Sequence, residues 1–149
     1  MNNHPSQIKV PATYLRGGTS KGVFFRLEDL PEAARQVVLV ATGSEVEIAL
    51  ASAKVLEAEG IGADVVSMPC AELFDAQPEA YKAEVLPTGA LIVSIEAGST
   101  LGWERYTGRS GINIGIDTFG ASAPAEDLFA HFGFTAEAIV PQILNKLNA

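Results

Sequence analysis

The sequence contains one cysteine, Cys70, among 149 residues. A disulfide needs two cysteines, so no intrachain disulfide framework is possible, and a lone thiol is typical of a reducing compartment. Long apolar runs are also missing. No segment approaches the roughly 20 apolar residues of a membrane span, and residues 1–6 lack the apolar core of a signal peptide. We therefore expect a cytoplasmic protein with no membrane partner.

Basic side chains are scarce as well. Ten Lys and Arg residues face eighteen Asp and Glu residues, which gives a net charge of −8. Nonspecific binding to nucleic acid or anionic lipid needs a basic face, so we expect neither partner. Apolar residues make up 48% of the chain, which is enough for a core. The length predicts one domain, with room for an appendage.

The charge is unevenly distributed along the chain. Residues 1–36 carry five basic and three acidic side chains, a balance of +2, whereas residues 37–149 carry five basic and fifteen acidic ones, a balance of −10. A change of sign at one place in a short chain suggests that two segments of different origin meet there. We therefore predict two parts, residues 1–36 and residues 37–149.

The first part is predicted to form a β-hairpin. A weakly alternating stretch at residues 7–15 and the apolar run of residues 23–25 flank the glycine-rich turn RGGTSKG of residues 16–22. Two strands of this length bury too little apolar surface to be stable alone. We expect them to be an appendage.

The second part begins with the apolar run VVLVA of residues 37–41, which predicts a strand buried on both faces of a parallel sheet. The spacing of Ser44 and Glu47 predicts a capping box at the start of a helix that ends near Gly60. Further strands are predicted at residues 63–68, 91–95 and 111–116, and further helices at residues 79–86, 101–106, 122–132 and 135–147. Pro141 lies inside the last helix, where it should kink the helix or delay its start.

Each candidate site has a structural explanation that we favour. The loop of residues 17–22 lacks the Walker spacing and is best explained as a hairpin turn. Residues 42–44 precede a helix and could hold an anion, but Glu45 and Glu47 already occupy its positive end, which favours simple capping.

Cysteine and aromatic side chains are explained in the same way. Cys70 has no histidine near it in sequence, since His4 and His131 are distant, so a buried or half-buried thiol is favoured over a nucleophile. These three residues lack the spacing of zinc ligands. Trp103 and Tyr106, three residues apart, are expected to be core residues.

Four blocks of the second part carry a family resemblance. VVLVATGSEVEIAL, VVSMPCAELFDAQPEAYKAEVLP, SIEAGSTLGWERYTG and IGIDTFGASAPAEDLFAHFGFTAEAIV occur in this order between residues 37 and 147. Together they resemble the carboxy-terminal domain of transketolase. The resemblance implies an α/β fold, a three-layer sandwich with a mainly parallel five-stranded sheet flanked by helices. It also implies packing and dimer contacts without a settled catalytic role.

The full transketolase family transfers two-carbon ketol units between sugar phosphates, in the pentose phosphate pathway, with thiamine diphosphate and a divalent metal such as Mg²⁺. The resemblance places those cofactors on the two preceding domains, and the sequence has no GDG…N diphosphate signature. We therefore expect no catalytic residues, no cofactor and no metal in this chain. The missing domains or a second subunit are the expected partners, and a homo-oligomer is expected.

Residues 1–36 have a different resemblance. The string IKVPATYLRGGTSKGVFFRLEDLPEAA is similar to the amino terminus of the methylaconitate isomerase family, which has the diaminopimelate-epimerase-like fold. In an intact homologue, Arg16, Thr19, Ser20 and Lys21 could contact substrate carboxylates, because glycines let backbone N–H groups approach an anion.

Three hypotheses follow from these resemblances. The chain is a structural transketolase domain, or a subunit that completes a transketolase in trans, or the remnant of a cis-trans isomerase. We favour the first.

Overall fold

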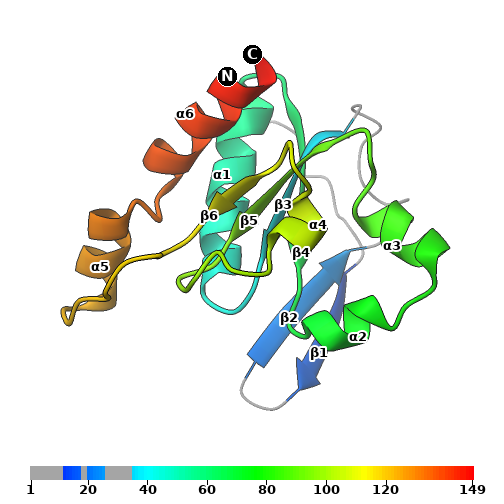
Figure 1. The fold of residues 1–149 in the computed structure, drawn as a ribbon, viewed down its shortest axis with the longest axis horizontal. Coiled ribbons are helices and arrows are strands. Elements are labelled where there is room, and N and C mark those ends of the chain that lie inside the picture. The colour runs from blue at the N-terminus through cyan, green and yellow to red at the C-terminus, as the bar shows by residue number, and fades with distance from the viewer. Residues whose placement is uncertain (1–11, 18–19, 26–34) are drawn as a thin grey trace, which may run out of the picture.

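A computed structural model describes residues 12–17, 20–25 and 35–149, with side chains from residue 35 onward. Two strands come first, followed by an alternation of strands and helices (Figure 1). The elements are β1 Ala12–Gly17, β2 Ser20–Phe25, β3 Arg35–Ala41, α1 Glu45–Ala58, β4 Gly62–Ser67, α2 Ala71–Asp75, α3 Glu79–Val85, β5 Leu91–Ile95, α4 Glu104–Thr107, β6 Ile112–Ile114, α5 Ala125–Phe132 and α6 Ala136–Leu147.

The main sheet is parallel, and its strands lie in the order β4-β3-β5-β6. Its centre is β3, where all residues from Val37 to Ala41 are fully buried, as the apolar run predicts. The expectation of five strands, which came from the family resemblance, is wrong for the described part of the chain, where this sheet has four. After Ile114 the glycines 115 and 120 and Pro124 interrupt the apolar pattern, and the chain continues into α5 without another strand.

Helices cover both faces of the sheet, which confirms the three-layer architecture (Figure 1). The side chains of β3 alternate between two cores. Val37 and Leu39 belong to the core under α1 and α6, whose members include Leu56 and Ile143. Val38 and Val40 belong to the core on the other face, against which Phe74, Leu86, Trp103 and Tyr106 from the region of α2, α3 and α4 pack. Trp103 and Tyr106 are half-buried core residues, as expected.

Some of the predicted helix ends agree with the structure and others do not. The capping box predicted for α1 is wrong: the Ser44 hydroxyl makes no cap bond and donates to Glu45 Oε1 at 3.0 Å. The opposite end follows expectation, because Gly60 has a φ of +81° and Ile61 N–H donates to the Leu56 carbonyl at 3.0 Å. Pro141 lies inside α6 but does not delay its start, since Thr135 caps the helix by accepting from Ala138 N–H.

The predicted hairpin is confirmed at the level of the backbone. Strands β1 and β2 pair antiparallel as a separate two-stranded sheet, with Arg16 opposite Lys21 and Gly17 opposite Ser20. Residues 1–11, 18–19 and 26–34 lie outside the described residues, and so do all side chains before Arg35. Strand β3 begins at Arg35, whose Nε lies 2.7 Å from Asp64 Oδ2 on β4, so the predicted boundary at residue 36 falls within a strand.

The α2 helix was not expected from the sequence. It has only five residues, too few to show a helical period. Within the described ranges, no helix is both long and apolar enough to cross a membrane.

Candidate functional site

The carboxyl edge of the parallel sheet is the first place to search for a site, because α/β proteins bind ligands there, where the strand order reverses. The chain runs from β3 outward to β4 on one side and then to β5 on the other. The reversal therefore lies between β3 and β5. The loops at this edge are residues 42–44 after β3, residues 96–103 after β5 and residues 115–124 after β6.

Two carboxylates stand at the reversal point. Glu45 opens α1 and is buried, with 6% of its surface exposed, and Glu96 directly follows β5. Burial raises the pKa of Glu96 above its ordinary value, and the nearby charge of Glu45 raises this pKa further. Glu96 Oε2 is buried without a hydrogen-bond partner. The reversal point is therefore acidic and holds an unsatisfied acceptor.

These residues do not fit a diphosphate group. An anion at the α1 N-terminus would meet Glu45 and Glu47 in the first turn and Glu96 directly after the neighbouring strand β5. Among the residues with described side chains, no cluster of three or more His, Cys, Asp or Glu side chains could hold a metal. The reversal point therefore does not fit the diphosphate of thiamine diphosphate, the cofactor that the family resemblance implies for the full enzyme.

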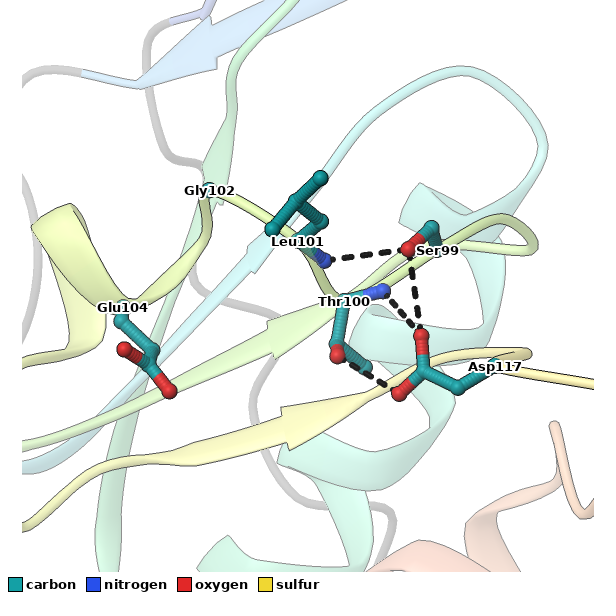
Figure 2. A pocket seen from close by; sticks show the side chains of 6 residues that line it. All are labelled: Ser99, Thr100, Leu101, Gly102, Glu104 and Asp117. Carbon is teal, nitrogen blue, oxygen red and sulfur yellow. Dashed lines mark hydrogen bonds between the residues drawn. The ribbon is translucent and has the colours of Figure 1, made fainter.

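Next to this point, Asp117 ties the loops after β5 and β6 together (Figure 2). Its Oδ1 accepts from Thr100 N–H at 2.9 Å and from the Ser99 hydroxyl at 3.1 Å, and its Oδ2 accepts from the Thr100 hydroxyl at 2.7 Å. Leu101 N–H in turn donates to Ser99 Oγ at 3.2 Å. The two Thr100 bonds, the hydroxyl's first, lower the pKa of Asp117. Asp117 is therefore ionised at neutral pH.

The same two loops approach each other closely in the backbone. Ile116 N–H donates to the Gly98 carbonyl at 2.6 Å. A Cβ added at Gly115 would lie 2.6 Å from Thr100 Cγ2 and 2.8 Å from the Gly98 oxygen, so only glycine fits there. The hydrogen bonds of Asp117 and the close backbone approach of Gly115 to Gly98 and Thr100 together hold residues 98–101 in one position.

Two large apolar side chains project from these loops. Leu101 is 91% exposed and Phe119 is fully exposed. Leu101 also lines an open hollow of about 400 Å³ together with the polar side chains of Ser99, Thr100, Glu104 and Asp117 (Figure 2). The Asp117 carboxylate accepts from both hydroxyls and so holds the loop that presents Leu101.

The cysteine and histidine that the sequence singled out are not among these residues, although Cys70 lies in the loop after β4, at the same edge of the sheet. Cys70 is half-buried before α2, where its thiol donates to Glu72 at 3.4 Å. His131 lies on α5 against the Phe132 ring, and Figure 1 shows α5 and α2 at opposite sides of the sheet. The structure therefore does not bring Cys70 and His131 together; His4 lies outside the described residues.

The four candidate anion contacts lie in the hairpin. Arg16 is on β1, and Ser20 and Lys21 are on β2, while Thr19 falls outside the described residues. Their side chains are not described, so contact with an anion stays a prediction.

Sequence reasoning missed Asp117, Leu101 and Phe119. The bonds of Asp117 span 17 and 18 residues, and no local pattern marks such a contact. A weak signal existed for Phe119, an apolar residue beside Gly120 in a polar stretch, whereas Leu101 was placed in the helix predicted at residues 101–106, which begins only at Glu104 in the structure.

Known proteins similar to this chain are transketolases. Residues 24–135 match the family described as the transketolase-like TK C-terminal domain. The chain is 48% identical to a transketolase of Rhodobacter capsulatus, over 87% of this chain and 20% of that protein. It is 54% identical to the chromosomal transketolase of Cupriavidus necator, over 83% of this chain and 17% of that protein. The chain thus spans about a fifth of these relatives.

Solved structures give the same result. Transketolase from Leishmania mexicana matches with a TM-score of 0.71 and 46% identity, over 77% of this chain and 17% of that one. Transketolase from Campylobacter jejuni matches with a TM-score of 0.69 and 31% identity, over 94% of this chain and 19% of that one. A split-gene transketolase, described as an inactive beta4 tetramer, shares the fold at a TM-score of 0.62 and 24% identity, over 76% of this chain and 40% of that one.

Proposed function

Since the chain belongs to the transketolase C-terminal domain family, we propose that it serves as a structural and subunit-contact domain of a transketolase and does not catalyse ketol transfer by itself. The family match over residues 24–135, in a chain that spans about a fifth of its relatives, carries this proposal. The acidic reversal point supports it, because the place where an α/β fold usually binds an anionic ligand repels one here.

The test uses the full chain and a bacterial transketolase truncated before its own C-terminal domain. The truncated protein must first be shown to bind thiamine diphosphate, which establishes that it is folded. We expect no ketol transfer from the chain alone with thiamine diphosphate, Mg²⁺ and donor and acceptor sugar phosphates. We also expect saturable binding of the chain to the truncated enzyme. Ketol transfer by the chain alone, or stoichiometric thiamine diphosphate binding to it in calorimetry, would contradict the proposal.

Completion of a transketolase in trans is the second candidate. One structural neighbour is described as a split-gene transketolase, which is a precedent for a transketolase whose gene is divided. In the same assay, this candidate predicts that added chain raises the ketol transfer rate of the truncated enzyme. Binding without any gain in rate would favour the purely structural role.

We also propose that residues 1–36 derive from a methylaconitate-type isomerase and are distinct from residues 37–149. The change in charge balance from +2 to −10 supports this proposal, while the family match beginning at residue 24 weighs against a boundary as late as residue 36. Limited proteolysis should remove residues 1–36 first. Equal protection of both parts would refute the division.

The backbone register supports an anion contact in the hairpin. Arg16 and Lys21 occupy directly opposite positions, where like charges repel, and an anion would relieve this repulsion. Titration with citrate should then show saturable binding that Lys21→Gln weakens; a flat titration would exclude it.

We further propose a cytoplasmic location and a homo-oligomeric assembly, the first supported by the single cysteine. Cell fractionation and light scattering would test them.

A further inference from the structure

Leu101 and Phe119 differ from the other exposed apolar residues of the described chain in degree and in setting. Leu50, Val55, Tyr81 and Leu147 lie on helices and are 38–48% exposed, and Leu73 on α2 is 66% exposed; single exposed apolar side chains of this kind are ordinary. Leu101 at 91% and Phe119 at 100% lie in loops that leave two neighbouring strands, β5 and β6, at the same edge of the sheet. Their nearly full exposure at one edge of the sheet makes this edge a candidate contact surface.

The frame that carries Leu101 is already organised. Asp117 holds Ser99 and Thr100 through three hydrogen bonds, and Ser99 Oγ accepts from the N–H of Leu101 itself (Figure 2). Phe119 follows Asp117 by two residues in the loop after β6. A backbone held in place before binding loses less conformational entropy when its side chain is buried. This is the property expected of an anchor residue.

The surroundings of the two anchors are acidic. Glu104 and Asp117 line the hollow beside Leu101, and Glu96 lies three residues before Ser99. Glu96 Oε2 is buried, so the acidic groups at the surface of the hollow are Glu104 and Asp117. A partner that fits this edge has an apolar surface for the anchors and basic or N–H groups around it.

We propose that Leu101 and Phe119 are the anchors through which this chain docks onto the remaining domains of a transketolase, on an apolar surface with a basic rim. This inference rests on the proposed function and names the face that carries it. The occupant follows from length, since the chain spans only 17–20% of its relatives and about four-fifths of such a protein is left to cover this edge. A second copy fits poorly, because it would bring Glu104 and Asp117 against their own counterparts.

The first experiment measures the affinity of the chain for the truncated transketolase described above. Leu101→Ala and Phe119→Ala are expected to weaken binding by about 30-fold or more each, as loss of a central anchor does. The matched control is Leu73→Ala, which removes a 66% exposed leucine from α2 and should change affinity by less than about twofold. Circular dichroism and urea unfolding would verify that all three variants remain folded.

Asp117→Asn tests whether the hydrogen bonds of Asp117 hold the loop of Leu101 in the position that docking needs. It keeps both anchors but replaces one accepting oxygen with a donor, so Thr100 loses a partner. We expect weaker binding with unchanged global unfolding, and a binding constant of the wild type that falls as salt is raised.

The outcomes distinguish a failure of the proposed function from a failure of the proposed anchors. If the wild-type chain does not bind the truncated enzyme, the proposed function fails and this inference fails with it. If the wild type binds and Leu101→Ala, Phe119→Ala and Leu73→Ala bind equally well, only the inference is overturned. Self-association of the chain that disappears in Phe119→Ala, without a change in binding to the truncated enzyme, would also overturn it by showing that a second copy occupies this face.

Discussion

Gly115 is the position at which one added carbon atom should disturb the docking edge most directly. It follows β6, and its Cα faces the loop after β5. In Gly115→Ala the new Cβ would lie 2.6 Å from Thr100 Cγ2, 2.8 Å from the Gly98 carbonyl oxygen and 3.3 Å from Thr100 N. Ordinary contacts of a Cβ are 3.4–4 Å, so the loop must move away from β6.

The size of the effect follows from this overlap. Overpacking of a well-packed site costs about 1–3 kcal/mol, and one of the three contacts here is a carbonyl oxygen that is already bonded to Ile116 N–H at 2.6 Å. A protein of this size has an m-value of about 2 kcal/mol/M in urea, so the urea midpoint should fall by about 0.5–1.5 M. The loop movement should also displace Leu101 and weaken docking.

The assay is urea unfolding followed by the far-ultraviolet circular dichroism of the full chain. Gly120→Ala is the matched control, because a Cβ there meets nothing within 4 Å and its φ is not positive. Its midpoint should stay the same or rise slightly, since alanine restricts the unfolded chain more than glycine does. Equal midpoints for the two alanine variants would refute the packing argument.

A second substitution identifies the responsible contact. Thr100→Ser removes the methyl group that the new Cβ would meet but keeps the hydroxyl that donates to Asp117. In the Gly115→Ala background it should recover part of the lost stability, because the contact with the Gly98 oxygen remains. Full recovery would show that the backbone contact has no cost, and no recovery would show that the methyl contact has none.

Three further predictions concern the body of the domain. Ile143→Ala, at a fully buried position against α1, should cost about 2–5 kcal/mol in urea unfolding, and a loss below about 1 kcal/mol would contradict its place in the core. Thr135→Ala should cost about 1 kcal/mol, because its oxygen caps α6, whereas Ser44→Ala, where no cap bond exists, should cost less than about 0.5 kcal/mol in the same measurement. Burial raises the pKa of Glu96 in the folded protein above its ordinary value of 4.5, so the folded protein binds this proton more tightly than the unfolded chain does. The contribution of Glu96 to stability is therefore present at low pH and is lost as the pH rises from 4.5 through the raised pKa. Glu96→Gln should therefore gain stability relative to wild type between pH 4 and pH 8, and urea midpoints that differ by a constant amount across this range would refute the assignment.

Much of the fold was predictable because its signals are local. The run of residues 37–41 is apolar without interruption, and such a run is stable only when buried on both faces, which is where β3 lies. Gly60 marks the end of α1, because the positive φ that it adopts there is costly for other residues. The hairpin turn around residues 16–22 was identified by the same kind of signal.

The errors in the prediction have physical causes as well. The Ser44 capping box fails because Ser44 has helical dihedral angles, φ −67° and ψ −27°, whereas a side chain that accepts from the N–H of the first turn needs an extended backbone. The α2 helix is too short for a periodic pattern, and side-chain contacts outside the helix hold it, with Phe74 5.8 Å from the Tyr106 ring and Asp75 bonded to Tyr106 and Arg105. The fifth strand was inferred from the family and not from a local signal in these residues.

The sequence alone determined the layers of this domain, since the periods of its apolar residues decide which segments become buried strands and which become amphipathic helices. It also determined the family, through four blocks in one order. Only the tertiary structure decided where the docking edge lies. Asp117 meets Ser99 and Thr100 across 18 and 17 residues, and the loops that carry Leu101 and Phe119 lie at one edge only because β5 and β6 pair in parallel and end there. A contact that depends on the register of two strands has no local pattern, so it can be identified only once the sheet has formed.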